Sequence, residues 1–71
     1  MKHTLDVDML EGFEHTSILA SASGDGKSKK LVIVTKLDNG EIYSMIHVIR
    51  NNEFVGSTAS LEFAIDIYND L

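Results

Sequence analysis

The sequence contains no cysteine, so it can form neither a disulfide nor a thiolate zinc site. Without cysteines, the composition does not indicate whether the protein resides in an oxidising or a reducing compartment. No segment approaches the roughly 18 apolar residues of a membrane span. Residues 1–10 contain no apolar run of the signal-peptide type. We therefore expect a cytoplasmic protein that has no membrane partner.

The chain has 71 residues, which is enough for a single small domain spanning residues 1–71. A chain of this length buries only about 60% of its unfolded surface, and small domains usually gain further stability from disulfides, metals or oligomerisation. Since disulfides are excluded, the short length favours a homodimer.

The charge is unevenly distributed along the sequence. The net charge is −5, with eleven acidic residues against six basic ones. Residues 1–26 have one base against five acids, residues 27–50 have five bases against two acids, and residues 51–71 have four acids and no base. The basic residues are therefore confined to the centre of the chain, and the overall negative charge disfavours nucleic-acid binding.

The middle of the chain is predicted to be a β-hairpin. Residues 31–37 form an apolar, β-branched run of strand length, and Asn39-Gly40 is typical of a two-residue turn. Residues 41–50 are the returning strand. Asn51-Asn52 indicates a second tight turn before a short strand over 53–56. Upstream, residues 13–23 have strand character, and Gly24-Asp25-Gly26 interrupts it.

The two ends of the chain differ in how clearly they predict structure. Residues 61–71 have apolar side chains at spacings of three and four, as in an amphipathic helix, and Ser57, Thr58 or Ser60 can cap it. Near the N-terminus, residues 5–9 alternate as a strand would, although Thr4 could instead cap a short helix that ends at Gly12. We favour the strand.

These elements predict a two-layer α+β domain in which one C-terminal helix packs on an antiparallel sheet of three to five strands. Strand 41–50 is apolar on both faces, so the face without the helix would be free to bind a second chain. One face carries the set Ile42, Ser44, Ile46 and Val48. The other face carries Tyr43, Met45, His47 and Ile49. The sequence leaves open which set the helix covers, and we name the Tyr43 set as the candidate dimer or partner surface.

The sequence offers no combination of residues typical of an enzyme. It has no nucleophile elbow, and its paired carboxylates lie at exposed helix positions where burial cannot raise their pKa values. His3, His15 and His47 lack the spacing of a metal site. We therefore predict a non-enzymatic protein with no catalytic residues, no metal and no cofactor.

Three acidic residues follow the predicted helix at intervals of four. Glu62, Asp66 and Asp70 would line one helix edge, where like charges repel one another. A solvated, solubilising face explains this pattern. It also fits a negative ridge that meets a basic protein partner or imitates a nucleic-acid backbone.

Residues 30–71 resemble the three-stranded-sheet-plus-helix modules of ethylene-response-factor domains and of the arm-binding domains of phage-type integrases. The likeness rests on Val55-Gly56, then Ser60, then Ala64 and Tyr68 four residues apart. In those families this pattern closes the last strand, caps the helix and packs it on the sheet. The families bind DNA through Arg, Lys and Trp on the sheet, whereas this chain has no Trp. The resemblance therefore implies the architecture alone.

We therefore expect a small protein-binding or regulatory module, of the kind found in phages and plasmids, that dimerises through a sheet face and binds a basic partner through its acidic helix edge. The alternative is weak nucleic-acid binding through the basic hairpin 27–36 and Arg50. Its candidate residues are Lys27, Lys29, Lys30, Lys36 and Arg50.

Overall fold

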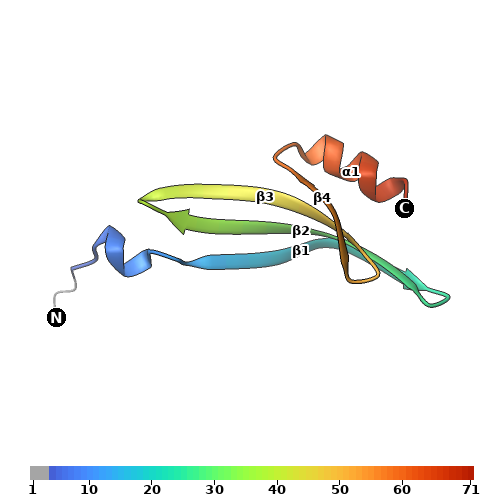
Figure 1. The fold of residues 1–71 in the computed structure, drawn as a ribbon, viewed down its shortest axis with the longest axis horizontal. Helices are drawn as coiled ribbons and strands as arrows, with labels where there is room; N and C mark the ends of the chain where they lie inside the picture. The colour runs from blue at the N-terminus through green and yellow to red at the C-terminus, as the bar shows by residue number, and fades with distance from the viewer. Residues whose placement is uncertain (1–3) are drawn as a thin grey trace.

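The computed structural model describes residues 4–71 and shows an antiparallel four-stranded sheet with one helix packed on it (Figure 1). The predicted α+β class is therefore confirmed. In chain order, the elements are η1 (Val7–Leu10), β1 (Glu14–Gly24), β2 (Lys27–Asp38), β3 (Glu41–Arg50), β4 (Glu53–Thr58) and α1 (Leu61–Asn69).

The four strands follow one another in space as they do in sequence, in the order β1-β2-β3-β4. Each connection is a tight turn with positive φ at both central residues, as two-residue hairpins of type I′ require. These residues are Asp25 and Gly26, then Asn39 and Gly40, then Asn51 and Asn52. The predicted turns are confirmed, and they set the register of all three strand pairs.

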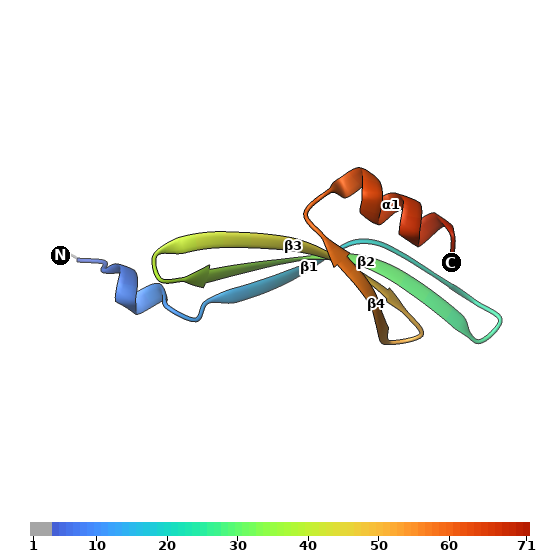
Figure 2. The same ribbon diagram turned by 45° about the horizontal axis from the view of Figure 1, so that its top comes forward.

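The sheet is long and narrow, with overall dimensions of 54 × 23 × 17 Å. Strands β1, β2 and β3 have ten to twelve residues each, whereas β4 has six. Irregularities in the register lie between Ile18 and Ala20 in the β1–β2 pair and between Val48 and Ile49 in the β3–β4 pair. Helix α1 lies over only one end of this long sheet, and η1 lies at the other end (Figures 1 and 2).

Ser60 caps the N-terminus of helix α1, and its Oγ accepts a hydrogen bond from the Phe63 amide at 3.2 Å. This contact identifies the N-cap among the three candidates, since it satisfies one of the unpaired amides at the helix start. Ala64 is fully buried, because a side chain of one methyl group lets the helix approach the sheet closely.

The main core lies between α1 and the sheet. Leu31, Ile46, Val48 and Ala64 form its buried cluster, and Ala20, Ile33, Ile67, Tyr68 and Leu71 pack around it. The remaining apolar residues of the helix, Leu61, Phe63 and Ile65, are exposed. The predicted apolar stripe was thus too wide, because a nine-residue helix on a narrow sheet buries only the side chains that point directly at it.

The predicted strand over residues 5–9 is wrong, because this segment forms the short 3₁₀ helix η1. The alternative of a short helix before Gly12 is closer to the structure, but its N-cap position is Asp6 instead of Thr4, and the Asp6 side chain makes no capping bond. Gly12, at φ 82°, redirects the chain so that its amide donates to the Leu37 carbonyl at 3.2 Å. The segment thus folds over the end of the β2–β3 hairpin.

Candidate interaction surfaces

The two faces of the sheet are covered unequally. Pairing of Leu31 with Val48 and of Ile33 with Ile46 places these side chains on one face, which we call the helix side because α1 packs there. The residues between them in sequence point to the opposite face. None of the elements in residues 4–71 lies over that face, which we call the open face (Figure 2).

Apolar side chains continue along the open face across all four strands. Val32 and Val34, in the centre, are only 4% and 8% exposed, because side chains from β1 and β3 flank them on either side. The apolar side chains farther out are much more exposed, such as Ile18 at 63% and Phe54 at 62%. The predicted set Tyr43, Met45, His47 and Ile49 lies on this face, whereas Ile46 and Val48 lie beneath the helix.

His47 is packed among apolar neighbours on the open face. Its ring meets that of Phe54 edge-on, with 5.4 Å between the ring centroids, and it lies opposite Val32 in the β2–β3 pair. The edge-to-face geometry is a favourable arrangement for two aromatic rings. The imidazole is thus half-buried within the apolar surface.

One end of the open face is acidic. Asp38 and Glu41 are paired across the β2–β3 hairpin, and the Tyr43 hydroxyl donates a hydrogen bond to Glu41. This bond raises the pKa of the exposed Tyr43 phenol above its usual 10.0, with smaller contributions from desolvation and from the Asp38 charge. Glu14 of β1 lies opposite Lys36, two residues before Asp38, and its carboxylate is 3.8 Å from the Lys36 ammonium group.

Beyond the end of α1, the helix side carries both polar and apolar side chains. Thr35 and Ser44 are cross-strand partners whose hydroxyl oxygens lie 3.3 Å apart, and Ser17 lies 3.0 Å from the His15 ring in β1. These hydroxyl and imidazole groups are compatible with water. Farther out on the same side lies the cross-strand pair Leu37 and Ile42, and Ile42 is 73% exposed, so the uncovered part of the helix side is mixed in character.

The predicted acidic edge is exposed along its length. Glu62 lies in the first turn of α1, Asp66 lies one turn later, and Asp70 is the C-cap residue, with its amide bonded to the Asp66 carbonyl at 3.2 Å. The last turn of the helix contains no basic residue. The three carboxylates therefore lie on the outer side of the helix, away from the sheet.

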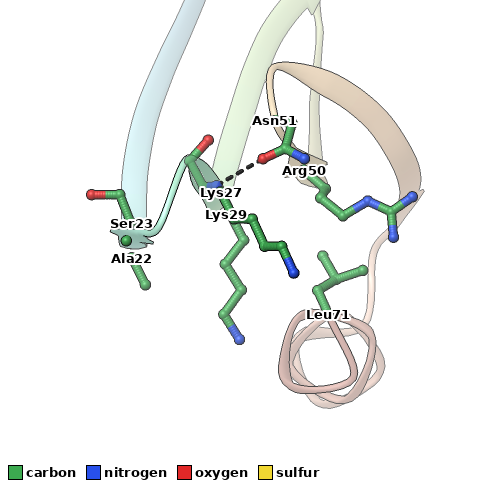
Figure 3. Close-up of a pocket in the computed structure, with 9 residues that line it drawn as sticks. Ala22, Ser23, Lys27, Lys29, Arg50, Asn51 and Leu71 are labelled. Atoms are coloured by element: carbon green, nitrogen blue, oxygen red, sulfur yellow. Dashed lines mark hydrogen bonds between the residues drawn. The ribbon is translucent and has the colours of Figure 1, made fainter.

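The predicted basic set is divided by the structure. Lys27, Lys29 and Arg50 line a shallow hollow at one end of the helix side, next to Leu71 (Figure 3). Lys30 follows Lys29 in β2 and points to the open face. Lys36 lies near the opposite end of the sheet, paired with Glu14. The five bases consequently do not form one continuous surface.

Lys29 has a structural role that the sequence did not reveal. Its Nζ donates to the Tyr68 carbonyl at 3.0 Å and lies 4.4 Å from the centre of the Tyr68 ring. An ammonium group also interacts favourably with the negative end of a helix. Lys29 thus fastens the last turn of α1 to β2. The contact joins residues 39 apart, and the chain pattern contained no signal for it.

Within residues 4–71, no group of three or more His, Cys, Asp or Glu side chains is arranged to hold a metal ion. His3 lies outside the described residues. The same part of the chain contains no helix long and apolar enough to cross a membrane.

The sequence matches no protein-family profile, and comparisons with curated proteins and with solved structures found no significant match.

Proposed function

We propose that the chain is a small non-enzymatic protein-interaction module that forms a homodimer through its open face. The observation that supports this proposal is the continuous apolar surface around Val32, Val34 and Met45, which no element among the described residues covers. An apolar surface of this kind gains free energy when a second apolar surface removes it from water.

The dimensions of the chain support a second copy as the partner. A compact monomer of this mass would have about 4,400 Å² of accessible surface and a radius of gyration of about 11 Å. This chain has 5588 Å² and 15.7 Å. The excess of about 1,200 Å² is comparable with the roughly 800 Å² that each partner contributes to a stable interface. A second copy would cover the open face with its own sheet, so that the two sheets would form the inner layers of the dimer.

The experiment is sedimentation equilibrium on the wild-type chain and on Met45→Lys. Met45 is 38% exposed in the centre of the open face, so a lysine fits the isolated chain but would be buried without a partner charge in the dimer. We expect a dimeric wild type and a monomeric variant that keeps the wild-type circular dichroism spectrum.

Ile42→Lys is the matched control. Ile42 lies on the same strand and is 73% exposed, but it points to the helix side, where we expect no contact between copies. This variant should remain dimeric. A wild-type chain that sediments as a monomer at every accessible concentration contradicts the proposal.

We further propose that the acidic edge of α1 binds a basic protein partner. The support is the exposure of Glu62, Asp66 and Asp70 on the outer side of the helix, which stays accessible when the open face is occupied. A partner that carries lysines or arginines fits this negative charge. One such partner is a DNA-binding protein, for which the acidic edge would imitate the nucleic-acid backbone. Asp66→Lys should weaken capture of such a partner by more than tenfold, about 1.4 kcal/mol. Equal capture by both proteins contradicts this part of the proposal.

The alternative proposal is weak nucleic-acid binding, favoured by the hollow that brings Lys27, Lys29 and Arg50 together. With Lys29 bound to Tyr68 and Lys36 at the far end of the sheet, few bases remain to neutralise phosphates. Titration of labelled duplex and single-stranded DNA at low salt separates the two proposals. Binding that disappears in a Lys27→Glu/Arg50→Glu variant supports the alternative, and we expect no binding.

A further inference from the structure

The charged side chains of the open face differ between its two ends, and this difference bears on how two copies can pack. At one end is Lys30, which is half-buried between Ser21 of β1 and Ile49 of β3. At the other end are the carboxylates of Asp38 and Glu41. These ends are eight residues apart along β2, or about 26 Å at the usual strand rise. The open face is therefore positive at one end and negative at the other.

The neighbouring charges do not cancel this polarity. Glu14 and Lys36 are adjacent to the acidic end but neutralise each other at 3.8 Å. The raised pKa of Tyr43 is consistent with a net negative field from Glu41 and Asp38. Lys27 and Arg50 lie near Lys30 along the sheet but belong to the helix side.

Two identical sheets can pack face to face about a two-fold axis in two ways. If the axis runs along the strands, Lys30 lies near its own copy and the acidic ends face each other, so like charges meet. If the axis crosses the strands, the ends exchange, and Lys30 of each chain meets the acidic end of the other. A two-fold interface repeats each contact, so the difference counts twice.

Resting on the proposed dimer, we propose that the two copies stack open face to open face with their strands antiparallel between the sheets, so that Lys30 of each chain lies against Asp38 and Glu41 of the other. The centre of this arrangement is the paired Val34 and Met45, midway between the charged ends. The two α1 helices then lie on the outer surfaces at opposite ends of the dimer. Each acidic edge stays accessible, and the dimer presents two of them.

The experiment is charge reversal at each end, read by sedimentation equilibrium at low ionic strength. Lys30→Glu alone and Asp38→Lys/Glu41→Lys together should each weaken the dimer about tenfold, or about 1.4 kcal/mol. Combining all three substitutions should restore the dissociation constant to within about threefold of the wild type, because opposite charges then meet again. Near 1 M salt, where the screening length is about 3 Å, the differences should disappear.

Lys27→Glu is the matched control, since it changes the charge equally at the same end of the sheet but on the helix side. It should leave dimerisation unchanged. Circular dichroism verifies the fold of each variant, and Asp38→Lys alone replaces the acidic pair if the double variant does not fold.

The outcomes separate this inference from the proposal beneath it. A dimer that dissociates with Met45→Lys but is indifferent to the charge reversals overturns the antiparallel arrangement and leaves the open-face dimer standing. Failure of the triple variant to recover has the same meaning. The amide of Thr16 points away from β2, so Thr16→Pro blocks pairing along the β1 edge without removing a bond to β2. A dimer indifferent to Met45→Lys and broken by Thr16→Pro overturns both. A monomeric wild type also overturns both.

Discussion

The helix side and the open face of this sheet are built from alternate residues of the same strands, yet the structure covers only one of them. On the helix side, α1 covers the apolar residues of one end, and the hydroxyl groups of Thr35 and Ser44 separate this core from the outlying pair Leu37 and Ile42. On the open face, apolar residues run across all four strands, and none of the elements within residues 4–71 covers them. The open face is the one that a second copy covers in the proposed dimer.

The largest expected effect comes from placing a charge beneath the helix. Val48 is fully buried in the core, so Val48→Asp would bury a carboxylate without a partner, at a cost comparable with the whole stability of a domain this small. We expect loss of the cooperative unfolding transition in urea, followed by circular dichroism. Ser44→Asp is the control, because Ser44 lies on the same strand and face beyond the helix and is exposed. A folded Val48→Asp chain would show that the helix side is not the main core.

The strands, turns and helix could be predicted because their signals are local. Asn39-Gly40 and Asn51-Asn52 favour positive φ by themselves, and a hydrophobic period identifies α1. Residues 5–9 were predicted wrongly because alternation suggests a strand only where a neighbouring strand is available. In the structure, Gly12 turns the segment over the hairpin end instead.

The surfaces were less predictable than the elements. Alternation along β3 defined two sets of side chains, but the register with β2 and the contact of Ala64 with Val48 were needed to assign the helix to one of them. Likewise, the basic hairpin 27–36 and Arg50 were grouped as one candidate nucleic-acid-binding surface. An extended strand of twelve residues instead carried Lys27 and Lys36 to opposite ends of the sheet.

A smaller effect should appear in the thermal stability of the intact chain. If a second copy covers the open face, association stabilises the fold by mass action, and Tm rises with protein concentration. A tenfold increase in concentration corresponds to about 1.4 kcal/mol per mole of dimer, which is a shift of a few degrees for a domain of this size. Met45→Lys should remove the concentration dependence, whereas Ile42→Lys should keep it. Equal slopes for the two variants would mean that the faces do not differ.

The smallest expected effect concerns the N-cap of α1. This cap stabilises the helix, and the helix covers the helix side only. Ser60→Ala removes the acceptor for the Phe63 amide and should reduce the free energy of unfolding by about 1 kcal/mol. Ser21→Ala, an equal truncation at an exposed position of β1, should change it by no more than about 0.5 kcal/mol. Because the cap stabilises α1 and α1 touches only the helix side, Ser60→Ala should leave the dissociation constant of the dimer unchanged at low temperature, where both variants are fully folded. Weaker dimerisation by Ser60→Ala would place the helix in the contact between copies and remove the distinction between the two faces.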